Sequence, residues 1–147
     1  MIGLYESNPF AREVQVDLAE ASLHFRQPER VVAIFENRVG DPLRSPKARL
    51  LYGVALLEQG KYGSAQVLLE PFVGKGKGRD SSPVALFSMG KILAQRSAGR
   101  ATALQFLDRF VVAAKPANGG WDPFHIDEKV AESRTLMAEL KKTPYSP

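Results

Sequence analysis

Apolar residues recur at spacings of three and four along most of the chain, which is the period of an amphipathic helix. The clearest example is the segment 50–71, in which the turn Gly60-Lys61-Tyr62 separates two such stretches. Two helices joined by so short a turn must lie antiparallel. The two apolar faces consist of Tyr52, Leu56 and Leu57 before the turn and of Ala65, Leu68 and Leu69 after it.

Four polar–proline pairs precede apolar-periodic segments: Asn8-Pro9, Ser45-Pro46, Ser82-Pro83 and Asp122-Pro123. A polar side chain at the N-cap accepts a hydrogen bond from an unpaired amide, and proline is tolerated at the first helical position. No alternating segment of useful length predicts a strand. The sequence therefore predicts an all-α protein of about seven helices, over residues 9–25, 28–39, 46–58, 61–73, 83–96, 99–114 and 124–141.

The helical pattern repeats along the chain. Gly53 corresponds to Gly90, 37 residues later, and to Ala19, 34 residues earlier. Small residues inside a helix cost stability unless a neighbouring helix needs the space. The same register aligns Val16, Leu50 and Phe87, then Leu18, Tyr52 and Met89, and then Ser22, Leu56 and Leu93.

This register resembles the tetratricopeptide repeat (TPR), a helix–turn–helix unit of about 34 residues. The repeats span about 12–45, 46–79 and 83–116, and the middle one matches best, with Gly53, Gly60, Tyr62, Ala65 and Leu69 in register. The resemblance implies one domain over 1–147, a right-handed superhelical stack of TPR-like repeats. The third repeat departs from the pattern, since Ser97-Ala98-Gly99 replaces the Gly-x-Tyr turn.

The last predicted helix, 124–141, follows the third repeat. Stacked repeats need a terminal helix with a polar outer face. Capping is the favoured role, and the alternative is that this helix folds into the protein's own groove or into that of a neighbour. Its apolar residues are Val130, Leu136, Met137 and Leu140.

In TPR proteins the first helices of the repeats line a concave groove. Two rows of the corresponding positions are apolar here, and they are either buried by adjacent helices or form a groove for a helix or an extended peptide. The resemblance implies a partner-binding groove formed by Glu13, Val16, Glu20, Leu23, Lys47, Leu50, Val54, Leu57, Phe87, Lys91 and Ala94.

Composition excludes several other functions. The chain has 147 residues, no cysteine and a formal net charge of +4. Its densest basic stretch, 74–79, is short and predicts a loop, so we expect no nucleic-acid partner. No apolar run is long enough to span a bilayer, so no membrane insertion is expected. His24 and His125 lack the spacing of a metal site, and we expect no cofactor.

No nucleophile–base pair can be identified, so the sequence predicts a protein that is not an enzyme. We expect an adaptor that binds a peptide or helix of a partner protein. The alternative is a structural, homo-oligomerising component or a chaperone of bacterial secretion or pilus assembly. Trp121 and Phe124 are expected to fasten the last helix, or to form a binding epitope. The expected location is cytoplasmic, or periplasmic for a mature fragment.

Overall fold

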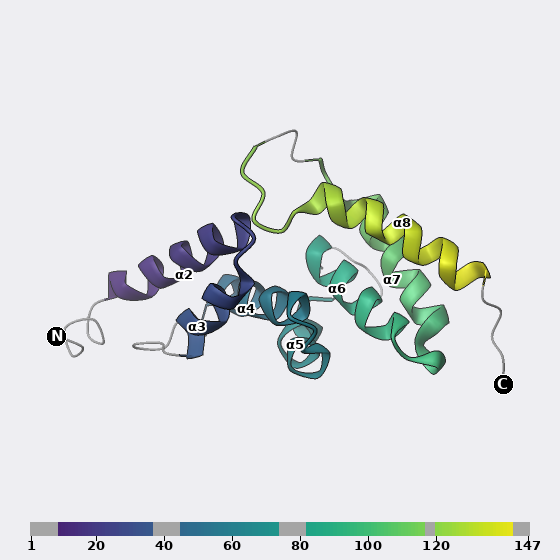
Figure 1. The fold of residues 1–147 in the computed structure, drawn as a ribbon, viewed down its shortest axis with the longest axis horizontal. Coiled ribbons are helices and arrows are strands. Elements are labelled where there is room, and N and C mark those ends of the chain that lie inside the picture. The colour runs from purple at the N-terminus through teal and green to yellow at the C-terminus, as the bar shows by residue number, and fades with distance from the viewer. Residues whose placement is uncertain (1–8, 37–44, 74–81, 117–119, 143–147) are drawn as a thin grey trace. The chain divides into compact units, whose positions relative to one another are not determined.

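The computed structural model describes residues 9–36, 45–73, 82–116 and 120–142, and this part of the chain forms seven α-helices and no strand (Figure 1). The all-α prediction is therefore confirmed, and every predicted helix is present. The helix predicted over 28–39 ends at Glu36, and its last three residues lie outside the described part. The α-helices are α2 (Pro9–His24), α3 (Pro28–Glu36), α4 (Pro46–Glu58), α5 (Tyr62–Leu69), α6 (Pro83–Ala94), α7 (Arg100–Ala113) and α8 (Ile126–Lys142).

Two short 3₁₀ helices accompany them: η2 (Glu70–Phe72) follows α5, and η3 (Ser97–Gly99) precedes α7. The chain forms two compact units, Met1–Leu68 and Leu69–Pro147, called unit 1 and unit 2 below.

The serine–proline pairs begin α4 and α6 as predicted. Ser45 has an extended backbone, and its Oγ accepts a hydrogen bond of 3.3 Å from the Ala48 amide. Ser82 holds the equivalent place before Pro83, but its side chain makes no capping bond. The prediction of side-chain capping is thus confirmed at Ser45 and wrong at Ser82. Pro9 begins α2, whereas Asn8 lies outside the described residues.

The start of the last helix needs a correction. α8 begins at Ile126 rather than at residue 124, because His125 has φ +52°, which a right-handed helix excludes. Asp122 nevertheless caps the helix, since its two carboxylate oxygens accept from the Ile126 amide at 3.2 and 3.1 Å. The capping residue was identified correctly, and the helix boundary was not.

The same type of turn ends α2 and α4. After α4, Gly60 at φ +78° donates to Leu57 O, and Lys61 donates to Leu56 O, both at 2.9 Å. These two bonds define the Schellman motif, in which the left-handed residue is usually glycine. After α2, Arg26 at φ +62° holds the place of Gly60, and the amides of Arg26 and Gln27 donate to the carbonyls of Leu23 and Ser22. The two motifs lie 34 residues apart, which is the offset between the first two predicted repeats.

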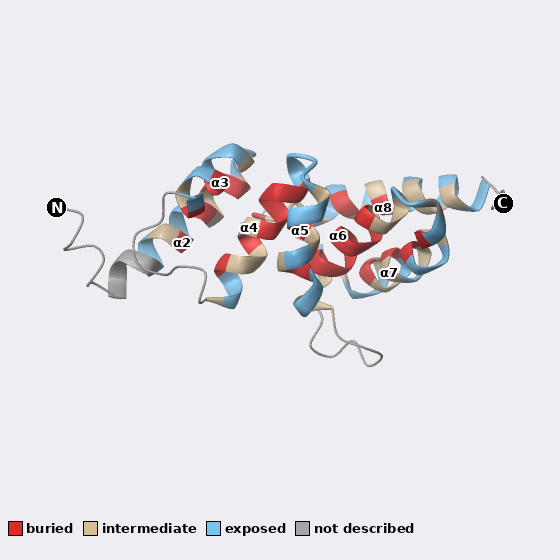
Figure 2. Cartoon of the chain, turned by 90° about the horizontal axis from the view of Figure 1, so that it is seen from below, coloured by how far each residue is buried: buried red, intermediate tan, exposed pale blue. Residues whose placement is uncertain are grey.

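Unit 1 buries the inner faces of α2, α3 and α4, which contact one another (Figure 2). Ala19 of α2 is completely buried, as is Phe35 of α3. The ring of Phe35 lies 5.4 Å from that of Tyr52 in α4, so a second helix packs on the first helix that follows it. Gly53 lies inside α4 and is buried.

Unit 2 repeats this arrangement with α6, α7 and α8, which also contact one another. α6 is buried on nearly all sides, and its Phe87 ring lies 5.4 Å from that of Phe110 in α7 (Figure 2). Gly90 sits where α6 crosses α7, because a Cβ added there would lie 2.8 Å from both Cγ and Cδ2 of Leu107. The prediction that Gly53 and Gly90 are buried inside helices is confirmed.

Gly99 accounts for the turn between α6 and α7, where the sequence departs from the predicted repeat pattern. A Cβ at this position would lie 2.7 Å from the backbone oxygen of Leu93 and 3.2 Å from its Cβ. The chain therefore passes so close to the end of α6 that only glycine fits.

α8 packs on both α6 and α7, as a capping helix must. Its buried residues are polar, however: Lys129 is 6% exposed and Ser133 is fully buried. The apolar residues that were expected to form the buried face are only half-buried, namely Val130, Leu136, Met137 and Leu140. Charged residues of α8 such as Asp127, Glu128 and Lys141 are exposed to solvent.

Candidate functional site

The predicted groove residues lie on α2, α4 and α6. Those of unit 1 lie on α2 and α4, which contact each other, and those of unit 2 lie on α6. α2 carries Glu13, Val16, Glu20 and Leu23; α4 carries Lys47, Leu50, Val54 and Leu57; α6 carries Phe87, Lys91 and Ala94.

Most of the apolar groove positions are buried within the chain itself. Val54 is fully buried, and Val16, Leu23, Leu57 and Phe87 are each at most 8% exposed. Of the two interpretations of these rows, packing against adjacent helices is therefore the one that the burial of these five side chains favours. Leu50 and Ala94 are half-buried.

The polar groove positions of unit 1 remain at the surface. Lys47 Nζ lies 3.0 Å from Glu20 Oε1, and this ion pair joins α4 to α2. The side chain of Lys47 is 52% exposed and that of Glu20 is 20% exposed. A pair so open to water stabilises the fold by about 1 kcal/mol at most. Glu13 is exposed as well, so two carboxylates and one ammonium group border this surface.

In unit 2 the chain's own α8 contacts two of the groove positions. Lys91 Nζ lies 2.8 Å from Glu132 Oε2 and 5.8 Å from the centre of the Phe87 ring. Lys129 Nζ lies 5.7 Å from the same ring, so both ammonium groups approach Phe87 within the range of a cation–π interaction. The predicted groove surface at Phe87 and Lys91 is thus covered by α8.

Lys129 was not singled out from the sequence, although it is the most buried charged residue of α8. Burying an ammonium group is costly unless hydrogen bonds replace its water. Here Nζ donates a hydrogen bond of 2.6 Å to the backbone oxygen of Phe124, and the Phe87 ring lies beside it. The contact fastens α8 to the segment that precedes it, so Phe124 takes part through its carbonyl group.

A shallow hollow of about 230 Å³ lies between the end of α7 and the start of α8. This volume is below the usual range of small-molecule sites. Among the described residues, no group of three or more His, Cys, Asp or Glu side chains could hold a metal ion. The hollow is lined by Val111, Ala114, Pro116, Asp127, Val130 and Arg134.

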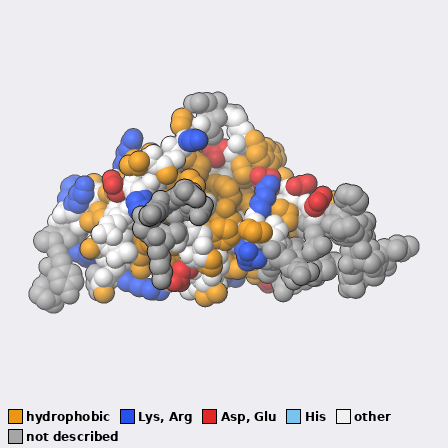
Figure 3. All heavy atoms as spheres, turned by 180° about the vertical axis from the view of Figure 1, so that it is seen from behind, with side chains coloured by type: hydrophobic (Ala, Val, Ile, Leu, Met, Phe, Trp, Pro, Cys, Tyr) orange, Lys and Arg blue, Asp and Glu red, His pale blue; other side chains and the backbone are white. Residues whose placement is uncertain are grey.

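The surface of the described residues carries mixed charge. On the face shown in Figure 3, side chains of both signs are interspersed with hydrophobic ones in the described part of the chain. None of the described helices has the length and apolar character needed to cross a membrane.

Two large apolar side chains of α2 and one in the turn that follows it are strongly exposed, and the sequence pattern did not predict them as a surface. Val14, Leu18 and Phe25 are 54%, 52% and 64% exposed. Leu18 was aligned with Tyr52 and Met89, of which Tyr52 is half-buried and Met89 is 4% exposed. The spacing of the exposed residues was the signal that could have revealed this face. Trp121, which was expected to fasten the last helix or form an epitope, is 56% exposed.

Comparison of the chain with protein-family models, with curated proteins and with solved structures finds no match.

Proposed function

We propose that the chain is a helical-repeat protein of the TPR type that binds a peptide or helix of a partner protein and does not act as an enzyme. The binding surface lies in unit 1, on the first helices α2 and α4. It consists of Glu13, Glu20, Lys47 and Leu50, and we call it the α2–α4 surface.

The repeat assignment is supported by two features that do not depend on the glycine register. The Schellman turns at Arg26 and Gly60 are separated by one repeat length. In each unit, a helix pair is followed by a helix that contacts both of its members. This is the arrangement expected when repeats stack side by side.

The observation that carries the proposal is the makeup of the α2–α4 surface. An ion pair joins the two helices, a second carboxylate and the half-buried Leu50 accompany it, and the apolar residues beneath are buried. A rigid framework with partly exposed polar groups around one apolar side chain suits an amphipathic helix. The excess of carboxylate favours a basic ligand, because charge complementarity governs specificity and association rate.

The experiment uses a phage-displayed library of basic amphipathic 20-residue peptides as the probe. Enriched peptides are synthesised, and their dissociation constants are measured by isothermal titration calorimetry. Glu13→Lys and Leu50→Asp should each weaken binding about tenfold, which corresponds to about 1.4 kcal/mol. Enrichment of no peptide would contradict the proposal.

The matched control is Glu36→Lys, which makes the same charge change at an exposed residue of the second helix α3. It should leave the dissociation constant within about twofold of the wild-type value, because Glu36 is not part of the α2–α4 surface and ordinary salt weakens interactions between exposed charges. If Glu13→Lys and Glu36→Lys weakened peptide binding equally, the effect would be one of overall charge. That result would rule out the α2–α4 surface as the binding site.

A further inference from the structure

The outer face of α2 carries an apolar stripe that is separate from the core. It consists of Val14, Leu18 and Ala21 of α2 and of Phe25, which directly follows the helix and whose amide donates to Ala21 O at 3.0 Å, and we call it the α2 seam. Three of its side chains are more than half exposed, and Ala21 is half-buried. Exposed apolar residues are ordinary when scattered singly, but a continuous row of them marks an interaction surface.

The spacing within the α2 seam is four, three and four residues. At 3.6 residues per turn these positions lie within about 60° of one another around the helix axis. Sequential spacings of four and three are those of the a and d positions of a coiled coil, whose partner is another helix. The buried residues Ala19 and Leu23 lie on a different side of α2, so the seam does not serve the core.

The equivalent side of the next first helix does pack on a helix. Tyr52 in α4 follows Leu18 by 34 residues, one repeat length, and its ring lies 5.4 Å from that of Phe35 in α3. In the repeat register, the position of Leu18 is therefore one that a helix covers. In α2 the same position is 52% exposed.

We propose that the α2 seam is the interface between two copies of this chain, with the two α2 helices antiparallel. In this orientation, large and small side chains alternate across the interface: Leu18 packs on Ala21 of the second copy, and Phe25 packs on Val14. The same contacts are made twice, because a two-fold interface is self-complementary.

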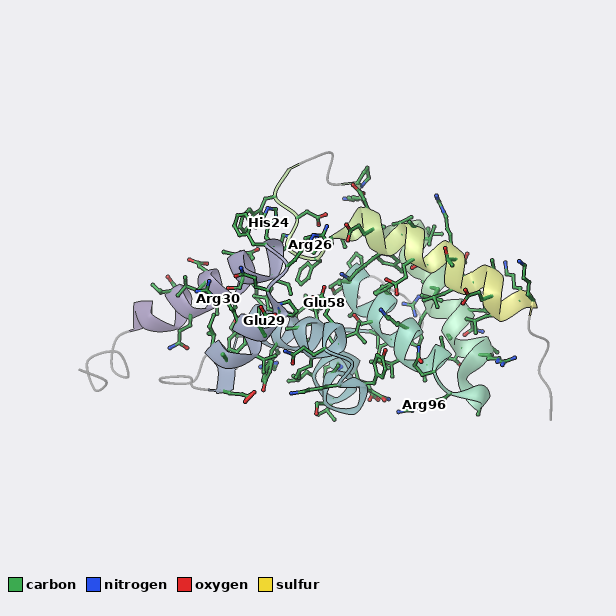
Figure 4. The ribbon with its side chains drawn as sticks, viewed as in Figure 1. His24, Arg26, Glu29, Arg30, Glu58 and Arg96 are labelled. Carbon is green, nitrogen blue, oxygen red and sulfur yellow. The ribbon has the colours of Figure 1, made fainter. Side chains whose placement is uncertain are left out.

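The charges beside the α2 seam fit the antiparallel orientation. Asp17 lies near the middle of α2, whereas His24 is the last residue of the helix and Arg26 follows it. Figure 4 labels His24 and Arg26 at this end. In the antiparallel register that pairs Leu18 with Ala21, Asp17 of each copy lies about two residues along the axis from His24 of the other, or about 3 Å. In-register parallel helices would separate Asp17 from His24 of the second copy by about 10 Å along the axis. The carboxylates of the α2–α4 surface are not involved, so this proposal is independent of peptide binding.

Four residues from each copy bury far less than the roughly 800 Å² per partner of a standard stable interface. The dimer should therefore be weak and concentration-dependent. Sedimentation velocity on the full chain, from about 1 µM to 1 mM, covers the affinities expected for such an interface. The mass should rise from the 16.2 kDa of one chain toward twice that value.

Leu18→Asp should abolish this association and keep the mass at 16.2 kDa over the whole range. The control is Val112→Asp, which makes a similar change at a residue of α7 that is 80% exposed. It should associate as the wild type does. Far-ultraviolet circular dichroism checks that both variants remain folded.

Charge exchange tests the orientation. Asp17→Lys should weaken association about tenfold, and adding His24→Glu should restore it. The two substitutions exchange the partners of one contact, and residues 17 and 24 of different copies meet only when the helices are antiparallel. A chain that stays at one mass at every concentration overturns the proposal, as does association that Leu18→Asp leaves unchanged. Association that depends on Leu18 without restoration by the double variant overturns the antiparallel arrangement.

Discussion

The crossing of α6 and α7 at Gly90 makes a quantitative prediction. Replacing Gly90 with alanine adds one methyl group inside a buried contact. Its carbon would lie 2.8 Å from Cγ and Cδ2 of Leu107 and 3.4 Å from the backbone oxygen of Ala103. Since Leu107 is itself fully buried, its side chain has little room to move away.

Two opposing effects set the size of the change. Alanine is favoured over glycine inside a helix by about 1 kcal/mol. Overpacking a core by one methyl group costs about 1–3 kcal/mol. Gly90→Ala should therefore lower the free energy of unfolding by about 1 kcal/mol. This net change is the overpacking cost minus the gain in helix propensity.

Gly63 provides the matched control. It lies in the exposed first turn of α5, and a Cβ there would meet nothing within 4 Å. Gly63→Ala should therefore raise the free energy of unfolding by up to about 1 kcal/mol through helix propensity alone. The melting temperatures of the two variants should differ by about 4–8 °C, given about 2–4 °C per kcal/mol for a chain of this size.

The assay is chemical and thermal unfolding followed by circular dichroism at 222 nm. A double-mutant cycle with Leu107→Ala isolates the contact, because that change removes both atoms that the new methyl group would meet. In the Leu107→Ala background, Gly90→Ala should stabilise by about 1 kcal/mol, and the coupling energy should be about 1–3 kcal/mol. Equal stabilisation by the two glycine substitutions, or zero coupling to Leu107, would refute the close approach of α6 and α7.

Two further predictions concern single side chains. The buried Ser133 Oγ makes no hydrogen bond, so Ser133→Ala should stabilise the protein by about 1 kcal/mol, measured by urea unfolding. The control Ser88→Ala should not stabilise the protein, because it removes a hydrogen bond of 2.7 Å from Ser88 Oγ to Val84 O. At the left-handed turns, Arg26→Gly should be about 1 kcal/mol more stable than Arg26→Ala, and Gly60→Ala should lose a similar amount. Equal melting temperatures of the glycine and alanine variants at position 26 would contradict that account.

The helices could be predicted from the sequence because their boundaries depend on local chemistry. Proline after serine fixes the starts of α4 and α6, and a left-handed glycine ends α4. The start of α8 was misplaced because nothing in the local sequence requires the positive φ of His125. Asp122 reaches the Ile126 amide across that residue, so the cap and the helix start are separated in the chain.

The candidate surface was predicted less well, because its exposure depends on neighbours that are distant in sequence. Hydropathy assigned the buried face of α8 to its apolar residues, yet Lys129 is buried because Phe124 O and the Phe87 ring replace its water. The exposed row on α2 was missed for the opposite reason. Leu18 has the same residue type and register as a packing residue, and only the three-dimensional structure shows it uncovered.

The anchoring of α8 at one end has a consequence for its motion. Its first half holds the capping bond to Asp122, the tethered ammonium group of Lys129 and the buried Ser133, whereas 138–142 are mostly exposed. The free energy needed to open this helix therefore falls along its length, and it frays from the C-terminal end. Complete detachment must rehydrate a buried cation and uncover an aromatic ring in the same event. Release of α8 is therefore a rare, cooperative excursion of unit 2, and the loss of its last turns is frequent.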